Sequence, residues 1–374
     1  MASLLVVGGG VLGTLHSYLA ISAGLQVTHL ERTMVPAAAS VRNFGLIWVS
    51  GRRAGAELKL ALRARQIWGE IGLKIPDTGF RAHGSLTVAQ NEAELHVTEL
   101  AAKMDDADIR GFEFINGVDL LKLEPNLGKK VLGALRCNQD AIVEPGTVLT
   151  AIREYLLKTT TLYKWKPNSE VVDFKSSSDS FYIRTATGEK LTADYIVIVP
   201  GADHQGVFRE FFDGASIRRV RLYMGATESV NYRLKHSIAN ADSYRYYPAF
   251  ANCDLKSLKA QDSIAAAFNM QLLLSQRLDG TFTIGDTHQY EEPFPFEIEE
   301  APFTYLIKEI NNIFDSSTKI VRRWDGIYSQ TTNNEIYYRN RIKTNVHVIS
   351  GLGGRGNTLS PAIAEETLKS FAII

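Results

Sequence analysis

The sequence feature that most constrains the fold lies within the first 31 residues. The apolar run Leu4–Val7 is followed directly by the glycine-rich segment GGGVLG. A short, wholly apolar run is typical of a strand buried on both faces, as in a parallel sheet. After the glycines, residues 11–24 carry apolar side chains at helical spacing, and an alternating segment then ends at Glu31. This order predicts a strand, a tight loop, a helix and a second strand.

The spacing of the glycines predicts a dinucleotide site. Gly8, Gly10 and Gly13 fit the pattern G-x-G-x-x-G. Glu31 follows Gly13 by 18 residues, close to the spacing of about 20 expected for a ribose-binding acid. The helix N-terminus would offer free N–H groups and a positive dipole end to the phosphates. A carboxylate at this position disfavours the 2′-phosphate of NADP, although Arg32 weakens that argument. NAD and FAD both remain.

Composition limits the other classes of function. The 374 residues contain 41 Lys plus Arg and 41 Asp plus Glu, so no basic excess indicates a nucleic-acid partner. The N-terminal apolar run is too short for a signal peptide, and no stretch approaches the roughly 18–20 apolar residues of a membrane span. The isolated Cys137 and Cys253, with no ligand cluster at metal-binding spacing, indicate a reducing compartment and no metal site. We expect a cytoplasmic protein, and the sequence indicates no oligomeric state.

Further along the chain, the apolar periodicity predicts several elements outside the N-terminal unit. Helices are expected over 57–72, 91–106, 147–157 and 300–314. Strands are expected over 85–89, on both sides of KSSSDS, in ADYIVIVPGA and in HVIS. Residues 220–290 are predicted to be β-rich, including the segments SYRYYPAF and SIAAAFNMQLLLSQ.

This order predicts two domains interleaved in sequence. The nucleotide-binding domain would comprise residues 1–80, 140–215 and 320–374, and a β-rich substrate-binding domain would comprise residues 81–139 and 216–319. A nicotinamide-dependent dehydrogenase usually keeps its nucleotide domain in fewer pieces, whereas the split order is typical of FAD-dependent amine oxidoreductases. The predicted fold class is therefore α/β, with a Rossmann-type FAD-binding domain and an inserted β-rich domain.

Three segments carry a resemblance that covers almost the whole chain. They are VVGGGVLG with its following glutamate, EVVDF with GEKLTADYIVIVPGA, and VISGLGGRGNTLSPA. In these the chain resembles the D-amino-acid oxidase, glycine oxidase and sarcosine oxidase superfamily. In SVRNFGLIW, LLLSQRLDGTFTIGDTHQY, RRWDGIYSQ and GLGGRGNTLS it is most similar to an FAD-dependent oxidoreductase subfamily associated with phosphonate degradation.

The resemblance implies FAD as the cofactor and assigns residues to it. Sarcosine oxidase-like members attach the flavin to a late cysteine, but no cysteine follows Cys253, so non-covalent FAD is expected. The implied cofactor-binding residues are Gly8, Gly10, Val11, Leu12, Gly13, Glu31, Arg32, Ser40, Arg42, Asn43, Phe44, Gly45, Leu46, Val171, Gly201, Gly354, Arg355, Gly356, Asn357, Thr358 and Leu359. The last six would place backbone N–H groups at the pyrimidine end of the flavin, where the reduced ring is anionic.

The segment SVRNFGLIW contains two polar side chains in an otherwise apolar run. On this assignment it would run from the ribose towards the flavin. Ser40 could bond a pyrophosphate oxygen, Arg42 could neutralise phosphate charge or face the substrate, and Gly45 would permit close approach to the ring. A buried arginine and a buried Asn43 would be costly without partners, which a dinucleotide would supply.

The expected reaction is oxidation of a C–N bond, by hydride transfer from a neutral amine to flavin N5 and hydrolysis of the imine. No catalytic base is assigned. Oxygen or another carrier would accept the electrons. The predicted substrate-binding residues are Tyr246, His288, Arg322 and Tyr328, with Arg245, Arg277 and Tyr247 as further candidates.

Tyr328 stands where glycine oxidase-like members carry an arginine that grips the substrate carboxylate. The preferred substrate is therefore an amine bearing another acidic group, such as an aminophosphonate or its N-alkyl derivative. A glycine, sarcosine or D-amino-acid oxidase or dehydrogenase is the alternative. An FAD-binding protein of tRNA modification without amine turnover is a third reading, which the zero net charge disfavours.

Overall fold

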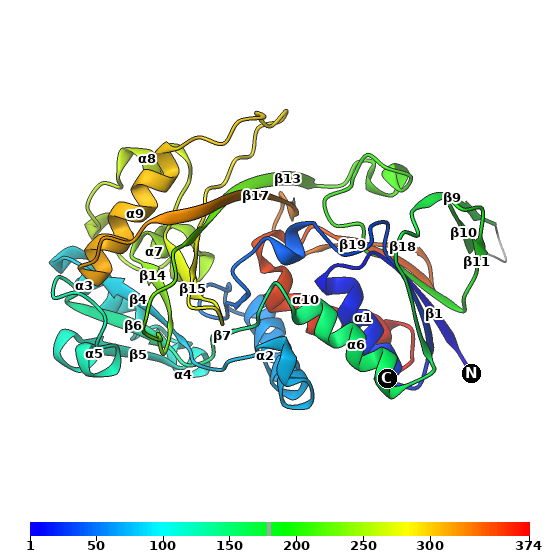
Figure 1. The fold of residues 1–374 in the computed structure, drawn as a ribbon, viewed down its shortest axis with the longest axis horizontal. Coiled ribbons are helices and arrows are strands. Elements are labelled where there is room, and N and C mark those ends of the chain that lie inside the picture. The colour runs from blue at the N-terminus through cyan, green and yellow to red at the C-terminus, as the bar shows by residue number, and fades with distance from the viewer. Residues whose placement is uncertain (178–180) are drawn as a thin grey trace.

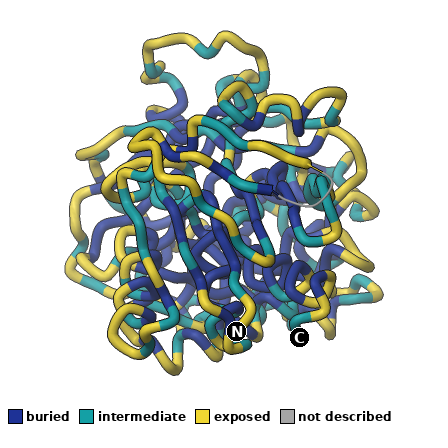
Figure 2. The backbone as a smooth tube through the Cα atoms, turned by 90° about the vertical axis from the view of Figure 1, so that its right-hand side faces the viewer, coloured by how far each residue is buried: buried dark blue, intermediate teal, exposed yellow. Residues whose placement is uncertain are grey.

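The computed structural model describes residues 1–177 and 181–374. Two units lie side by side along its longest axis (Figure 1). Within the described residues, one unit is built on a six-stranded sheet and the other on an eight-stranded sheet. Both chain termini lie near each other in the first unit, and buried backbone fills the interior while exposed segments form the loops (Figure 2). The predicted α/β fold class, with a β-rich unit inserted into a unit built on a mostly parallel sheet, is confirmed.

The six-stranded sheet is parallel except for one edge strand. Its order is β18 (Tyr338–Lys343), β19 (Val346–Ser350), β12 (Tyr195–Ile198), β1 (Ser3–Val7), β2 (Gln26–Leu30) and β8 (Tyr163–Lys166). Leu4 and Val6 pack into one buried apolar cluster, and Leu5 and Val7 pack into another. The strand buried on both faces that the first residues predict is therefore present.

The first of these clusters lies under a layer of helices that contains the chain's last helix. The helices are α1 (Val11–Ser22), α2 (Ala56–Lys74), α6 (Val148–Thr159) and α10 (Gly356–Ser370). The second cluster is covered by β9 (Val171–Ser176), β10 (Phe181–Thr185), β11 (Lys190–Leu191) and the 3-10 helix Arg209–Phe212. Part of the turn expected across KSSSDS lies outside the described residues.

The eight-stranded sheet joins segments from both proposed insertions. Its order is β17 (Ile320–Thr331), β13 (Ile217–Thr227), β16 (Phe282–Gly285), β15 (Leu273–Gln276), β14 (Ser237–Asn240), β4 (Ser85–Ala89), β6 (Gly133–Cys137) and β5 (Phe112–Asn116). Helices of this unit are α3 (Glu92–Ala101), α4 (Ala107–Arg110), α5 (Gly117–Leu123), α7 (Asp242–Tyr246), α8 (Ser263–Ala267) and α9 (Ala301–Phe314). The helix expected over 91–106 therefore ends early, at Ala101.

Two expectations for this unit are wrong. SYRYYPAF is helical rather than extended, because Tyr244 packs edge-on against Phe250 and bonds the Thr98 hydroxyl, and these contacts override the β propensity of tyrosine. The first part of SIAAAFNMQLLLSQ forms α8, with the Asp262 side chain accepting from the Ile264 N–H, so the strand begins only at Leu273.

The division drawn at residue 320 also differs from the sheet pairing. β17 starts at that residue, yet it pairs along almost its whole length with β13 and so belongs to the eight-stranded sheet. The two units are also connected by a short antiparallel ladder between β3 (Leu46–Ile47) and β7 (Ala141–Ile142). The segment SVRNFGLIW therefore enters the space between the two units. No described helix is long and apolar enough to cross a bilayer.

Candidate active site between the two units

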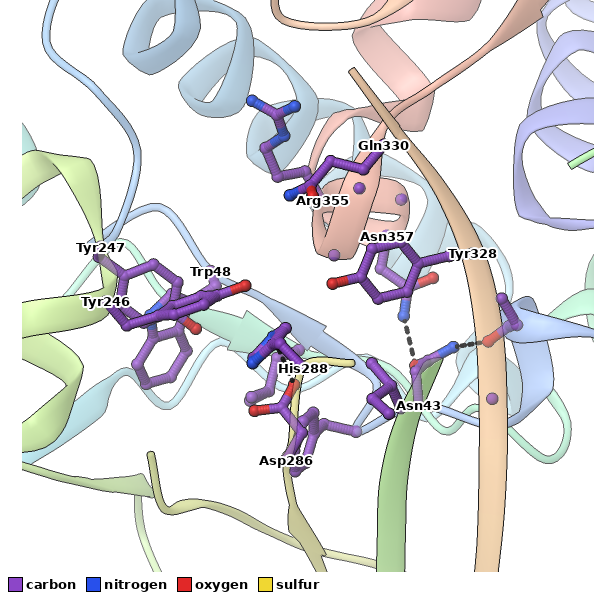
Figure 3. Close-up of a pocket in the computed structure, with 18 of the residues that line it drawn as sticks. Asn43, Trp48, Tyr246, Tyr247, Asp286, His288, Tyr328, Gln330, Arg355 and Asn357 are labelled. Carbon is purple, nitrogen blue, oxygen red and sulfur yellow. Dashed lines mark hydrogen bonds and ion pairs between the residues drawn. The ribbon is translucent and has the colours of Figure 1, made fainter. Parts of the chain in front are cut away.

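A cavity of about 530 Å³ lies between the two units. Its walls come from Val11 and from four stretches of chain: residues 39–57, residues 222–290, residues 326–335 and residues 353–357. Figure 3 shows Asp286 and His288 on one side, Arg355 and Gln330 on another, and Tyr246 and Trp48 on a third. A cavity of this size between units is a usual place for a small ligand.

The glycine-rich loop has the close packing that a phosphate-binding turn requires. A Cβ atom on Gly8 would lie 2.4 Å from the Val199 carbonyl oxygen, and one on Gly13 would lie 1.9 Å from the Gly8 carbonyl oxygen. Gly8 also has φ of +114°, where other residues are strained. Among the described residues the Ser40 hydroxyl accepts from the Val11 N–H, the first of α1, and the next N–H groups of this first turn have no side-chain acceptor and are open to an anion.

Two side chains at the end of the second strand, His29 within it and Glu31 just after it, hold this loop in place. His29 Nε2 donates to the Gly8 carbonyl at 3.0 Å, and its Nδ1 accepts from the Tyr163 hydroxyl at 2.9 Å. Burial lowers the pKa of His29 to about 3, so the ring is neutral. Glu31 Oε2 accepts from the Gly9 N–H at 2.8 Å. The exposed Arg32 pairs with Asp203 at 2.9 Å.

In SVRNFGLIW, partners for the polar side chains come from the protein itself. Ser40 Oγ accepts from the Val11 N–H at 3.0 Å, which leaves its hydroxyl hydrogen free for an anion at the helix N-terminus. Asn43 Oδ1 accepts from the Gly45 N–H at 2.7 Å and from Asn357 Nδ2 at 2.9 Å.

The expectation that Arg42 is buried without protein partners is wrong. Its side chain is 44% exposed, and Nη1 lies 3.5 Å from Asp325 Oδ1. Its Nε donates to the Ala37 carbonyl at 2.7 Å. Gly45 has φ of +81°, and a Cβ there would lie 2.0 Å from the Val143 carbonyl oxygen. The close approach that Gly45 permits in this structure is therefore to protein backbone.

The C-terminal glycine loop forms another wall of the cavity. Gly354, Arg355, Gly356 and Asn357 line it, at the start of α10. The first N–H groups of a helix have no partner within the helix, so this end offers donors to an electron-rich ring. The last two residues expected here, Thr358 and Leu359, are buried and do not line the cavity. Thr358 Oγ1 instead accepts from the Trp48 N–H at 2.9 Å.

Arg52, which no sequence pattern singled out, follows a loop whose backbone is held by hydrogen bonds to Asp140 and Arg110. Asp140 Oδ1 accepts from the backbone N–H groups of Val49 and Ser50 at 2.5 and 2.9 Å. The fully buried Arg110 donates to the Ser50 carbonyl at 3.1 Å. These bonds fix the backbone that directs the Arg52 side chain, which is only 6% exposed.

Arg52 and Arg355 meet at one buried carboxylate. Their Nη1 atoms lie 3.6 and 3.4 Å from Glu57 Oε1. Two guanidinium groups and one carboxylate leave an excess positive charge in the cavity wall. Burial lowers the pKa of Arg355, and Glu57 opposes that shift. Arg52 Nε is buried and has no hydrogen-bond partner among the described residues. An added anion would satisfy both the charge and this donor.

The other walls are aromatic. Tyr246 stacks on His288 with ring centroids 4.3 Å apart, and Tyr247 lies edge-on to Tyr246 at 5.0 Å. Burial raises the pKa of Tyr328, so its hydroxyl remains protonated, and among the described residues that hydroxyl has no partner. The buried indole N–H of Trp48 is likewise unpaired. Unpaired buried donors at a cavity indicate a missing ligand.

The family comparison decides what that ligand is. The profile of the family described as FAD dependent oxidoreductase matches residues 3–369. The chain belongs to this family. It is therefore an FAD-dependent oxidoreductase, and FAD is its cofactor.

Individual relatives share limited identity with the chain. Glycine oxidase of Bacillus licheniformis is 22% identical over 377 residues, covering 96% of this chain and 90% of that protein. D-amino acid dehydrogenase of Helicobacter pylori is 22% identical over 263 residues, and the match spans 69% of this chain but only 56% of that protein. The crystal structure of glycine oxidase from Bacillus cereus superposes with a TM-score of 0.79 at 18% identity, covering 100% of this chain and 95% of the other. The superposition on the Bacillus cereus structure shows that the two proteins share a fold.

The residues present fit FAD. The packed glycines, the open N–H groups in the first turn of α1 and Glu31 suit the ADP part, and the free N–H groups of α10 suit the flavin. Among the residues assigned to the cofactor, those outside the cavity are Gly8, Gly10, Leu12, Gly13, Glu31, Arg32, Gly45, Val171, Gly201, Thr358 and Leu359. Val171 and Gly201 lie beside the six-stranded sheet, at the start of β9 and after β12.

The structure separates the residues predicted for the substrate. Tyr246, His288 and Tyr328 line the cavity. Arg322 does not: its side chain is 63% exposed, 4.0 Å from Asp279. Arg277 is also excluded, because it donates to Glu144 at 2.8 Å away from the cavity.

Arg245 and Tyr247 are at the cavity, although Arg245 Nε already donates to Asp242 at 3.1 Å. The sequence reasoning missed Trp48, Arg52, Glu57, Asp286 and Gln330. Three of these lie within segments that carry the resemblance: Trp48 in SVRNFGLIW, Asp286 in GTFTIGDTHQY and Gln330 in RRWDGIYSQ. Arg52 and Glu57 lie in none of them.

Proposed function

We propose that this chain oxidises the C–N bond of a small amine that bears an acidic group, with FAD held non-covalently. The observation that carries the proposal is the shared contact of Arg52 and Arg355 with Glu57. It leaves one net positive charge in a buried cavity wall, beside an unpaired guanidinium N–H. A carboxylate or phosphonate accepts paired hydrogen bonds from such groups.

The preferred substrate is an aminophosphonate or its N-alkyl derivative. Its support is the resemblance of SVRNFGLIW, GTFTIGDTHQY and RRWDGIYSQ to the phosphonate-associated subfamily, together with Tyr328 in place of a carboxylate-binding arginine. The alternative is a glycine, sarcosine or D-amino-acid oxidase or dehydrogenase, which the similarity to glycine oxidase supports.

The protein would contribute binding, orientation and exclusion of water. FAD, when bound, supplies the acceptor for a hydride equivalent. The arginine pair would fix the acidic end of the substrate, and the stacked Tyr246 and His288 would enclose its apolar part. The Tyr328 hydroxyl and the Trp48 indole N–H are further buried side-chain donors at the cavity that have no partner among the described residues. Holding the amine in one orientation lowers the entropic part of the barrier.

Anaerobic mixing of the flavin-loaded protein with a panel of amines tests this function. We expect N-methylaminoethylphosphonate to bleach the flavin absorbance faster than glycine, sarcosine or D-alanine. Faster bleaching by glycine would favour the alternative. Protein that is colourless after reconstitution with FAD, or flavin that none of these amines reduces, would contradict the proposal. Hydrogen peroxide formed under air would identify oxygen as the electron acceptor.

A further inference from the structure

We infer that Asp286, paired with His288, binds the ammonium group of the substrate and accepts its proton. The inference rests on the proposed function, because it assigns the group in that site that prepares the amine. An alkylammonium ion is the form most abundant at neutral pH, and its nitrogen has no lone pair. The amine must lose a proton before a hydride can leave the neighbouring carbon.

The position of Asp286 is the first observation. The residue follows β16, lines the cavity and is 7% exposed. Its Oδ1 is buried and accepts no hydrogen bond among the described residues. A buried carboxylate oxygen without a partner is costly unless a cation or donor meets it. Burial accordingly raises the pKa of Asp286, and His288 is the main opposing group.

The second observation is the fixed orientation of His288. Its Nδ1 lies 2.9 Å from the Asn269 carbonyl oxygen, so this nitrogen carries the hydrogen. Stacking on Tyr246 at 4.3 Å fixes the ring plane. Nε2 therefore presents its lone pair 3.6 Å from Asp286 Oδ2. A proton placed on Asp286 Oδ2 would face this lone pair.

Few other charges face the pair. Within the described residues His288 is the sole ion-pair partner of Asp286. The titratable groups that interact with Asp286 from other elements are the tyrosines Tyr246, Tyr247, Tyr290 and Tyr328. Burial raises the pKa of all four hydroxyls, so they stay neutral. Two guanidinium groups lie over rings of this set, Arg52 over Tyr247 and Arg218 over Tyr290.

The site therefore separates the two charges of the substrate. Figure 3 shows Asp286 and His288 away from Arg355, with Tyr328 beside the space between them. The ammonium N–H bond breaks, its electron pair stays on nitrogen, and the proton bonds to Asp286. Charge is conserved, because a cation and an anionic carboxylate become a neutral amine and a protonated pair. No oxidant takes part in this step.

Binding of ligands that cannot be oxidised tests the inference without turnover. The probes are 2-amino-2-methylpropanoate and 1-amino-1-methylethylphosphonate, whose amine carbons carry no hydrogen, and their hydroxyl counterparts. Titration calorimetry of FAD-loaded protein in buffers of different ionisation enthalpy counts the protons released. In the wild type we expect an amine to bind at pH 7 with almost no proton release. In Asp286→Asn the amine should bind at least about tenfold more weakly, while the hydroxyl counterpart is unchanged.

Matched variants separate this role from a structural one. Asp286→Glu should restore part of the amine affinity, and His288→Gln should keep amine binding while moving its pH midpoint. Asp213→Asn, an exposed carboxylate outside the cavity, is the control. Equal binding of amine and hydroxyl ligands by wild type and Asp286→Asn would overturn the inference. That result is distinct from failure of every amine to reduce the flavin, which contradicts the proposed function.

Kinetics supply a second readout once a reducing amine is found. In Asp286→Asn, kcat/KM at pH 7 should fall by about 10²–10⁴ and then rise about tenfold per pH unit towards the pKa of the free amine. A purely structural role would lower kcat/KM by the same factor at every pH, and that outcome would also overturn the inference.

Discussion

Asn357 donates a hydrogen bond from Nδ2 to Oδ1 of Asn43 at 2.9 Å. This bond joins the N-terminal segment SVRNFGLIW to the first turn of α10, near the other end of the chain. The same Oδ1 accepts from the Gly45 N–H at 2.7 Å, and Asn43 Nδ2 donates to the Ala39 carbonyl at 2.8 Å. One amide thus fixes two walls of the cavity relative to each other.

Replacing this amide should loosen the cofactor site. Asn43→Ala removes the acceptor of two hydrogen bonds and should lower the free energy of unfolding by about 1–3 kcal/mol. It should also lower the flavin content of purified protein, measured as the ratio of flavin to protein absorbance. Asn43→Asp keeps the acceptor and should lose less. Flavin content and melting temperature equal to wild type in Asn43→Ala would show that the bond is dispensable.

Replacing Arg42 should reduce stability and flavin retention less than replacing Asn43. Its ion pair with Asp325 is substantially exposed, so Arg42→Ala should cost no more than about 1 kcal/mol of unfolding free energy. Its effect on flavin retention should be smaller than that of Asn43→Ala, as measured by dialysis against FAD-free buffer. A larger loss of flavin would restore the sequence-based expectation that Arg42 neutralises phosphate charge.

Gly13→Ala should damage the nucleotide loop. The added Cβ would lie 1.9 Å from the Gly8 carbonyl oxygen, so helix and strand must separate. Overpacking of this kind costs roughly 1–3 kcal/mol, and we expect protein with little bound FAD. Gly146→Ala is the matched control, because no atom of the described residues lies within 4 Å of a Cβ at that position. Full flavin content in Gly13→Ala would refute the assignment of this loop.

The role of Arg52 and Arg355 in binding an acidic group can be tested by comparing amines with and without that group. Arg52→Ala removes one of two guanidinium groups on Glu57 and should raise KM for an acid-bearing amine by at least about tenfold. An amine of similar size without an acidic group should be affected much less. Arg52→Lys should recover only part of the affinity, since an ammonium group lacks the planar fork. Equal losses for both amines would place the acidic group elsewhere.

His29 should make stability sensitive to acid. Its folded pKa of about 3 lies below the ordinary 6.5, so the unfolded chain binds a proton first as pH falls. Between these values the wild type should lose about 1.4 kcal/mol of unfolding free energy per pH unit from this residue. His29→Gln can still donate to the Gly8 carbonyl but does not titrate. Denaturant midpoints of the two proteins should therefore converge or cross on acidification, and parallel curves would contradict this account.

The sequence by itself determined the nucleotide-binding unit. The strand at Leu4–Val7, the helix after Gly10 and the acid at Glu31 are specified by neighbouring residues, so periodicity and glycine spacing were sufficient. The extended order of elements likewise predicted the interleaved α/β architecture. Local propensity gave the wrong prediction, a strand, at SYRYYPAF. The segment is helical because Tyr244 packs against Phe250 in the folded chain.

Only the tertiary structure decided which charged groups form the site. Arg52, Glu57 and Asp286 belong to no spacing pattern that would distinguish them from other charged residues. Their significance depends on burial and on contacts between distant segments, as when Asp140 holds the loop that carries Arg52. Arg322 is as basic in sequence as Arg52, yet it is 63% exposed and outside the cavity, whereas Arg52 is 6% exposed and lines it. A charge interacts strongly with a ligand only where the surrounding fold excludes water, and that exclusion is a property of the assembled chain.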